Sequence, residues 1–282
     1  MSFFLLLAIG FLLNAGASAL VFWRGSLDAG GAAVGTVVGT LIFACGGPLF
    51  WIILMAFFIS STGLGSVGRS AKTGLKEIHQ KGGRRDMVQV LANGGMGMLA
   101  AVLFRLTGDP AWAAGFAVSF ASSNADTWAG EIGVLSRAEP VSLLGFRPVR
   151  RGVSGGVSLL GTLASLGGAL FISLIFAAVN LPLGIFPGSF VRLALFVTAA
   201  GVLGALVDSL LGATLQAQYQ ALGGAFGKTA GSLLLTERSR GEDGTPNRLA
   251  RGLRFVNNDV VNLASCALVT IAAVLLAPVL LA

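Results

Sequence analysis

Charged residues are scarce in this chain, and their scarcity excludes an ordinary soluble protein. Only 11% of the 282 residues are Asp, Glu, Lys or Arg, whereas 55% are hydrophobic. Soluble domains usually carry about 25% charged residues. The sequence therefore predicts a polytopic membrane protein, and its 41 glycines suit helices that pack closely within a membrane.

Histidine and cysteine are nearly absent as well. The chain has one histidine, His79, and two cysteines, Cys45 and Cys266, and none of them has the spacing of a metal-binding motif. Neither a zinc site nor a disulfide framework is predicted. Because no Lys or Arg precedes the first apolar run, Phe3–Leu13, we expect a retained first helix and not a cleaved signal peptide.

Eight apolar runs approach the length of about 20 residues that a membrane-spanning helix needs. The second and third runs are short and meet at Gly46-Gly47-Pro48, which is consistent with a tight hairpin. The predicted fold is an all-α membrane helix bundle that forms one integral-membrane domain over residues 1–282. The predicted spans are Ser2–Trp23, Gly30–Gly47, Pro48–Leu64, Met87–Leu106, Ala111–Leu135, Ser154–Leu181, Ser189–Gln216 and Val256–Leu281.

Basic residues are distributed unequally over the connections between these spans. Of the 19 Lys and Arg residues, all but Arg105 and Arg192 fall on one side of the bundle. Loops rich in Lys and Arg stay in the cytoplasm. We therefore expect both termini on the non-cytoplasmic side. The expected cytoplasmic loops cover about residues 65–86, 136–153 and 217–255.

The last basic loop contains a regular pattern. Arg248, Arg251 and Arg254 recur every three residues. This spacing suggests a short basic helix at the membrane surface.

Six short polar stretches interrupt the apolar pattern, and the topology places all of them at the cytoplasmic end. Carboxylates and amides within membrane helices are costly and usually mark a working site. Two stretches end inward-running helices, three begin outward-running helices, and one lies in the last loop. They are QVLAN (Gln89–Asn93), NADTWAGE (Asn124–Glu131), RRGVSGGVS (Arg150–Ser158), DSLLGATLQ (Asp208–Gln216), RGLR (Arg251–Arg254) and NNDVVN (Asn257–Asn262).

Carboxylates, amides, glycines and arginines together suit a site for magnesium and a nucleotide. Mg²⁺ takes carboxylate oxygens and keeps positions for water and substrate phosphates. Glycines at a helix start let backbone N–H groups approach a phosphate, and arginines bind phosphate with two hydrogen bonds. Phosphoryl transfer depends mostly on positioning and charge neutralisation. We therefore assign Asp126, Glu131 and Asp208 as catalytic residues and, with Asp259, as ligands of Mg²⁺ or its waters.

The neighbouring polar residues are assigned to substrate and nucleotide binding. Ser154, Gly155 and Gly156 are expected to hold phosphate at the start of a helix. The whole binding set is Asn93, Asn124, Thr127, Arg150, Arg151, Ser154, Gly155, Gly156, Ser158, Gln216, Asn258 and Asn262. Polar side chains in membrane helices also bond helix to helix without further function. That alternative stays open for Asn93, Ser158, Gln216 and Asn262.

Five runs resemble the integral-membrane family called domain of unknown function 92. They are RRDMVQVLANGG, SSNADTWAGEIG, RRGVSGGVSLLGT, VDSLLGATLQ and RGLRFVNNDVVNLAS, in this order between about Ser60 and Ser265. The family includes transmembrane protein 19 and the phytyl-phosphate kinases of plants and cyanobacteria. The resemblance implies a kinase that converts a prenyl monophosphate, such as phytyl or geranylgeranyl phosphate, into its diphosphate. Related prenol and dolichol kinases favour CTP as phosphoryl donor.

Two other functions fit parts of the pattern. A transporter or lipid translocator also uses intramembrane carboxylates, but charges at one face and not the midplane disfavour it. A cytidylyltransferase would form a CDP-linked lipid.

For the kinase, the expected partners are an isoprenoid phosphate lipid, CTP or ATP with Mg²⁺, and membrane lipids, with no nucleic acid. The expected location is a cell inner membrane or its equivalent, with the site facing the cytoplasm and a role in tocopherol or quinone salvage.

Overall fold

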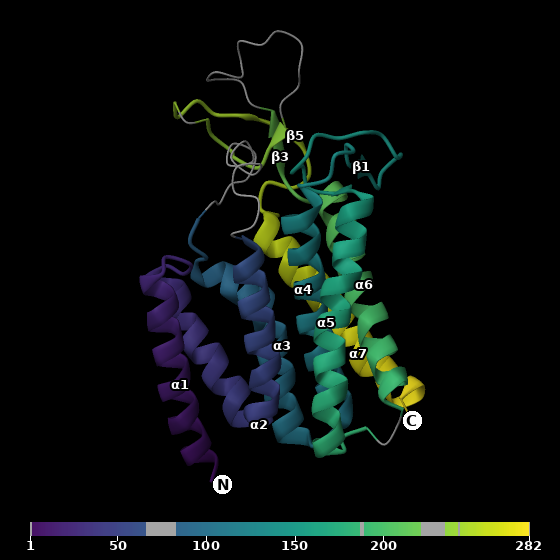
Figure 1. Ribbon diagram of the computed structural model, residues 1–282. Coiled ribbons are helices and arrows are strands. Elements are labelled where there is room, and N and C mark those ends of the chain that lie inside the picture. Colours follow the sequence, from purple (N-terminus) through teal and green to yellow (C-terminus); the bar gives the residue numbers. More distant parts are fainter. Residues whose placement is uncertain (1, 66–82, 187–188, 221–234, 242, 282) are drawn as a thin grey trace.

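The computed structural model describes residues 2–65, 83–186, 189–220, 235–241 and 243–281, which form a helical bundle with short strands at one end (Figure 1). The prediction of a helical membrane bundle is confirmed. Within the described residues, the helices are α1 (Phe3–Trp23), α2 (Ala29–Gly65), α3 (Met87–Thr107), α4 (Pro110–Gly133), α5 (Leu159–Leu183), α6 (Phe190–Thr214) and α7 (Asn258–Leu280). All of these except α4 are long and apolar enough to cross a membrane.

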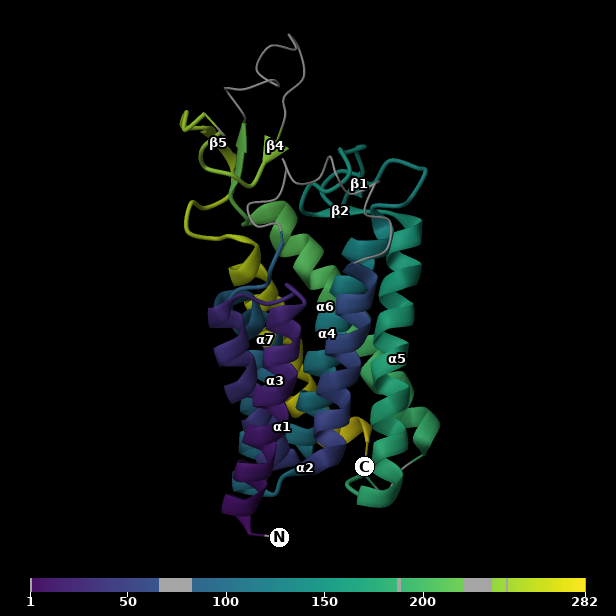
Figure 2. The ribbon, with the colours of Figure 1, turned by 60° about the vertical axis from the view of Figure 1, so that its left-hand side comes forward.

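Helix α4 lies in the middle of the bundle, and its composition explains this position. It packs against α2, α3, α5, α6 and α7, as Figure 2 also shows. Gly201 and Gly204 let α6 approach Ala121 and Ser122 closely, because a Cβ at either glycine would clash with them. Small residues at helix interfaces are how membrane helices pack. Because protein and not lipid surrounds α4, its Ala- and Ser-rich sequence needs less hydropathy than the outer helices.

Helix α2 is a hairpin of two halves and not one straight helix. Gly47, beside Pro48, has non-helical backbone angles of φ 75° and ψ −177°, and the chain reverses there (Figure 1). The first turn lies against Arg85, and the last turn lies near Glu131, at the same end of the bundle. This break coincides with the predicted boundary at Gly46-Gly47-Pro48. The count of eight spans stays a prediction, because length and composition identify six candidate helices in the described chain.

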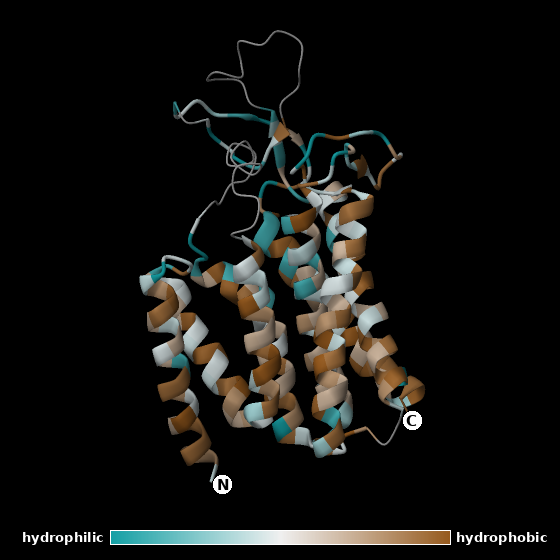
Figure 3. Cartoon of the chain, viewed as in Figure 1, coloured by the Kyte–Doolittle hydropathy of each residue, from teal (hydrophilic) through white to brown (hydrophobic). Residues whose placement is uncertain are grey.

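Polar and apolar residues separate along the bundle axis. The two ends of the chain lie at one end of the bundle, and the loops with strands lie at the other (Figure 1). Hydrophilic residues concentrate in those loops and in the adjoining helix ends (Figure 3). We call this the polar end. Aromatic side chains pack in the hydrophobic core, where the rings of Phe50 and Phe116 stack at 4.4 Å between centroids.

Two small sheets form at the polar end, which the sequence did not predict. Strand β1 (Val141–Ser142) pairs with β2 (Gly156–Val157). A second sheet has the antiparallel order β4-β3-β5, from Leu235–Thr236, Gln218–Gln220 and Arg248–Arg251.

The predicted basic surface helix at Arg248–Arg254 is therefore wrong, because Arg248–Arg251 form strand β5 and residues 252–254 are not helical. Leu249 lies opposite Tyr219 in the sheet, and the Arg251 guanidinium donates to Gln218 Oε1 at 2.9 Å. These contacts stabilise a strand here, although the three-residue spacing of the arginines favours a helix. Of the predicted loop at 65–86, residues 66–82 lie outside the described residues.

Candidate functional site

A cavity of about 1170 Å³ lies at the polar end and extends between the helices. Its wall comes from all seven helices, α1 to α7, from the loops before α2 and α3, from the α4–α5 loop and from Glu237. The cavity brings together the residues assigned from the sequence, with the exceptions of Asn124 and Arg150. The assigned residues that line it are Asn93, Asp126, Thr127, Glu131, Arg151, Ser154, Gly155, Gly156, Ser158, Asp208, Gln216, Asn258, Asp259 and Asn262.

Asp126 of α4 and Asp208 of α6 form an acidic pair in this cavity. They are close enough for their charges to interact. Asp208 Oδ2 accepts a hydrogen bond from Ser265 Oγ at 2.9 Å. With its amide nitrogen turned toward Asp208, Asn262 donates to the same oxygen at 3.0 Å. Helix α7 therefore fixes the Asp208 carboxylate with two donors that lie on one helical face, three residues apart.

The first turn of α7 supplies another carboxylate to the cavity wall. Asn257 caps this helix by accepting from the Val260 N–H at 3.0 Å. Asp259 follows in the first turn and is only 4% exposed. An acidic residue is favourable near a helix N-terminus because of the helix dipole. The sequence therefore places Asp259 in the wall through an ordinary helix start.

The carboxylates share a cavity but do not form one compact metal centre. Among the described residues, no three Asp, Glu, His or Cys side chains gather closely enough to hold a metal ion. Mg²⁺, however, commonly binds one or two carboxylates and completes its shell with water and substrate phosphates. Asp126 and Asp208 fit that pattern. The role of Asp126, Glu131, Asp208 and Asp259 as metal ligands stays a prediction.

Glu131 lies near a basic residue that the sequence analysis assigned only to topology. Burial lowers the pKa of the Arg85 guanidinium, and the nearby Glu131 charge opposes this shift. Arg84 and Arg85 both line the cavity. The signal for them was present, since only three residues separate the two arginines from the QVLAN stretch, in the run RRDMVQVLAN. The cavity therefore has a basic side at the start of α3 and an acidic centre at α4 and α6.

The glycine-rich stretch differs from its expected form. Helix α5 begins at Leu159, and its N-cap is Ser158, whose Oγ accepts from the Gly161 N–H at 3.1 Å. Gly156 lies earlier, in β2, and its N–H donates to the Val153 carbonyl at 3.1 Å. Gly155 adopts a φ of 81° and packs directly against Ala213. The prediction that these glycines begin a helix is wrong, because they form a turn that fits against α6.

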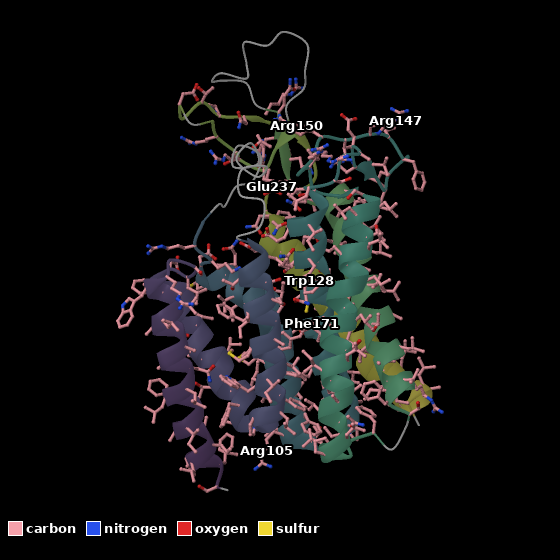
Figure 4. The ribbon with its side chains drawn as sticks, viewed as in Figure 1. Arg105, Trp128, Arg147, Arg150, Phe171 and Glu237 are labelled. Atoms are coloured by element: carbon pink, nitrogen blue, oxygen red, sulfur yellow. The ribbon has the colours of Figure 1, made fainter. Side chains whose placement is uncertain are left out.

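Asn124 and Arg150 lie outside the cavity wall. Asn124 is 0% exposed; its Oδ1 accepts from Ser60 and Ser61, and its Nδ2 donates to the Gly168 carbonyl at 2.8 Å. Since these bonds join α2, α4 and α5, we reassign Asn124 from substrate binding to helix packing. Arg150 is exposed in the loop above the helices (Figure 4).

Several other assigned residues form local bonds. Asn93 Nδ2 donates to the Gln89 carbonyl at 3.0 Å, and Thr127 Oγ1 donates to the Ser123 carbonyl at 2.8 Å. Both bonds stay within one helix. Arg151 donates to the Arg137 carbonyl at 2.8 Å within its own loop.

Glu237 is a site residue that sequence reasoning missed. It accepts hydrogen bonds from Ser154 Oγ and Gln216 Nε2, each at 2.8 Å. It lines the cavity and lies where the loops meet the helix ends (Figure 4). Gln218 and Arg251 also donate to the Ser154 carbonyl, at 3.2 and 3.1 Å. The sheet therefore fixes the position of Ser154. No residue spacing in the sequence predicts this arrangement.

Comparisons with known proteins agree with the resemblance noted in the sequence. The family described as Integral membrane protein DUF92 matches residues 12–270. Protein PGR of Arabidopsis thaliana is 31% identical over 264 residues, which cover 86% of each chain. Protein VTE6, chloroplastic, of the same plant is 26% identical over 270 residues, 91% of this chain and 69% of its own.

An uncharacterized membrane protein of Methanocaldococcus jannaschii is 31% identical over 188 residues, 66% of this chain and 74% of its own. No solved structure matches this chain significantly.

Proposed function

Because this chain belongs to the DUF92 integral-membrane family, we propose that it is a prenyl-phosphate kinase. It transfers a phosphoryl group from a nucleoside triphosphate, preferably CTP, to a phytyl- or geranylgeranyl-type monophosphate and forms the diphosphate. The observation that supports this most directly is the Asp126–Asp208 pair in a cavity at the polar end of a membrane bundle.

The location of the cavity suits both substrates. A prenyl chain dissolves in the bilayer, so its phosphate lies near the level of the lipid headgroups. A cavity among the helix ends at the polar end can meet that phosphate and a water-soluble nucleotide. The acceptor is already a phosphate, so the reaction needs no strong base to remove a hydroxyl proton. Positioning and charge neutralisation are then the main tasks of the protein.

The residues divide these tasks by charge. Asp126 and Asp208 would hold Mg²⁺, which when bound neutralises charge on the reacting phosphates. Ser265 and Asn262 keep the Asp208 carboxylate in one orientation. Arginines on the other side of the cavity would bind phosphate oxygens with their fixed, planar set of donors.

The test is a direct assay with the purified protein in detergent. Mg²⁺, labelled CTP or ATP, and phytyl or geranylgeranyl monophosphate are supplied, and products are identified by mass spectrometry. The expected products are the prenyl diphosphate and the nucleoside diphosphate. Asp126→Asn is expected to remove them. Asp109→Asn is the matched control, because Asp109 caps the opposite end of the same helix and Asn caps equally well.

Other products would identify a different reaction. A CDP-linked lipid with released pyrophosphate would show that the protein is a cytidylyltransferase and not a kinase. If no combination of nucleotide and prenyl monophosphate gives a product, and sealed proteoliposomes show substrate flux without nucleotide, the protein is a transporter and not a kinase. A prenyl diphosphate formed equally well by Asp126→Asn would contradict the assigned site.

A further inference from the structure

The cavity extends beyond the acidic pair, down between α1 and the second half of α2. We call this extension the furrow. The residues that define it are Asn14, Ala17, Ser18 and Val21 of α1 and Leu54 and Phe58 of α2. The furrow and the acidic pair belong to one continuous cavity. The question is what kind of molecule would fill both parts.

Two helical stripes form the sides of the furrow. Residues 14, 17, 18 and 21 share one face of α1 because they are spaced by three, four and seven positions. Residues 51, 54, 55 and 58 have the same spacing on α2. Both helices run toward the polar end (Figure 1), and residues of both stripes line the cavity.

The two stripes meet at the lower end of the furrow. Trp51 Nε1 donates to Asn14 Oδ1 at 2.9 Å, and Asn14 Nδ2 donates to the Gly10 carbonyl at 2.7 Å. The amide of Asn14 therefore has a partner on both atoms and is only 3% exposed. This pair joins the helices and closes the furrow, whereas above it the side chains line the cavity.

The upper end of the furrow is basic. Arg24, Arg84 and Arg85 line the cavity there. The Arg84 guanidinium lies 5.9 Å from the ring centre of Phe22, and the Arg85 N–H donates to the Ser26 carbonyl at 2.9 Å. The start of α3 is thus fixed to the loop after α1. Below this basic rim the stripes are mostly apolar.

The depth of the furrow matches part of a lipid tail. Asn14 and Arg24 are ten residues apart on α1, which is about 15 Å at roughly 1.5 Å per residue. This is about half of the bilayer's hydrocarbon thickness of roughly 30 Å. A soluble phosphate compound has no use for an apolar extension of this depth, whereas a phosphate with an attached hydrocarbon chain does.

We propose that the furrow between α1 and the second half of α2 binds the hydrocarbon tail of the acceptor lipid, with its phosphate at Arg24, Arg84 and Arg85. This inference rests on the proposed kinase function for the identity of the lipid. Helix α1 packs substantially only on α2 among the described helices, so the tail enters from the membrane beside it. The Asn14–Trp51 pair sets the depth that the tail can reach.

Filling the furrow tests its role through chain-length dependence. Gly35, on the first half of α2, lines the same cavity, and a Cβ added there would lie 3.6 Å from Ser18 Oγ, an ordinary contact. We therefore expect the ring in Gly35→Phe to occupy the furrow beside Ser18. The Michaelis constant for a twenty-carbon prenyl phosphate is expected to rise at least about tenfold, the effect of exposing roughly two methylene groups. The Michaelis constants for a five-carbon prenyl phosphate and for the nucleotide should change less than about twofold.

The matched control is Gly16→Phe on α1. A Cβ at Gly16 has nothing within 4 Å, and Gly16 does not line the cavity. This variant should keep the wild-type constants for both lipids. Equal losses in Gly35→Phe and Gly16→Phe, or equal losses for short and long lipids, would contradict the furrow.

A second measurement works without turnover. A prenyl monophosphate with a photoreactive tail is bound to the wild-type protein, crosslinked and mapped by mass spectrometry. Crosslinks are expected in the peptides that contain Ala17–Val21 and Leu54–Phe58. They should persist in Asp126→Asn, which still binds the lipid, and decrease in Gly35→Phe. Crosslinks only on α5 or α6 would overturn the furrow.

The two measurements separate the two proposals. Crosslinks in the furrow without any prenyl diphosphate product would contradict the proposed kinase activity but support the furrow as a lipid-binding site. Prenyl diphosphate formed with no length dependence and with crosslinks elsewhere would contradict the furrow and leave the kinase. Because the crosslinking arm uses the wild-type chain, a variant that fails to fold does not prevent a decision.

Discussion

At the scale of single residues, surroundings decide what an amide does in this protein. Asn124 and Asn262 both occur in polar stretches and were both assigned to binding. Asn124 has its amide enclosed by bonds to α2 and α5, whereas Asn262 faces the Asp208 carboxylate. The same residue type therefore stabilises packing in one helix and supports the acidic pair in another.

Asp208→Asn is predicted to lower prenyl-phosphate kinase turnover by about a hundredfold or more. The uncharged amide would hold Mg²⁺ weakly, so the ion that neutralises the reacting phosphates would be lost. The amide oxygen can still accept from Ser265, so the thermal midpoint should stay near that of the wild type. Turnover and thermal unfolding in detergent are measured together.

Ser265→Ala keeps the Asp208 charge and removes one of its two donors. Loss of a residue that orients a ligand typically costs about tenfold to a hundredfold, and we expect the lower end because Asn262 remains. Turnover is measured over a range of Mg²⁺ concentrations, since a less ordered carboxylate should require more of the ion. An unchanged Mg²⁺ requirement in Ser265→Ala would contradict the supporting role of this hydroxyl.

Asn124→Ala is predicted to destabilise the fold and leave substrate binding intact. It removes three bonds between helices, each worth about 0.6 kcal/mol in membrane proteins, so about 2 kcal/mol in total. Thermal unfolding should shift to lower temperature, while the Michaelis constants measured well below that transition should not change. If Asn124→Ala has normal stability but a raised Michaelis constant for the nucleotide, Asn124 takes part in substrate binding after all.

The sequence predicts the polar residues of the site but not how each helix is rotated. Helical spacing (i, i+3, i+7) puts Asn124, Thr127 and Glu131 on one face and leaves Asp126 off it. In the structure Asp126 shares the cavity with Thr127 and Glu131, and Asn124 is buried among helices. The rotation of α4 depends on five neighbouring helices, which a spacing rule for one helix does not contain.

At the scale of elements, Gly47 lets one apolar segment become a hairpin. Its φ of 75° and ψ of −177° belong to a region that is essentially restricted to glycine. A Cβ at this position has nothing within 4 Å, so the obstacle to another residue is backbone strain and not a steric clash.

Gly47→Ala is therefore predicted to destabilise the protein by about 1–3 kcal/mol. Gly63→Ala is the matched control, since Gly63 also lies in α2 with open space around its Cβ position but within regular helix. Alanine there should be neutral or stabilise by up to about 1 kcal/mol. Unfolding in detergent compares the two variants. Equal effects would show that the reversal at Gly47 does not depend on glycine.

Helices were predictable and strands were not, for a physical reason. Long apolar runs ended by Gly, Pro and charged residues predict α1 and α3 closely, and Gly46-Gly47-Pro48 marked the turn inside α2. The strands contain two to four residues and pair across the loops. Such short segments have no periodicity of their own, so Glu237 and the fixed position of Ser154 could not be foreseen.

At the scale of the whole molecule, function depends on which side of the membrane the polar end faces. The acidic pair, the basic rim and the sheets lie at one end, and the two termini lie at the other. Charge predicts that the polar end is cytoplasmic. A kinase that uses a soluble nucleotide needs this orientation, because nucleoside triphosphates are made and kept in the cytoplasm.

Single cysteines at opposite ends test the orientation. Thr107 and Thr245 are both exposed, Thr107 at the end of α3 away from the polar end and Thr245 in the loop before β5. In a chain whose Cys45 and Cys266 are replaced by alanine, a maleimide that cannot cross membranes should label Thr107→Cys on intact cells. It should label Thr245→Cys only after permeabilisation. The reverse pattern would place Asp126 and Asp208 on the outer side, away from nucleotide, and the kinase proposal would fail there even if the fold and the cavity are as described.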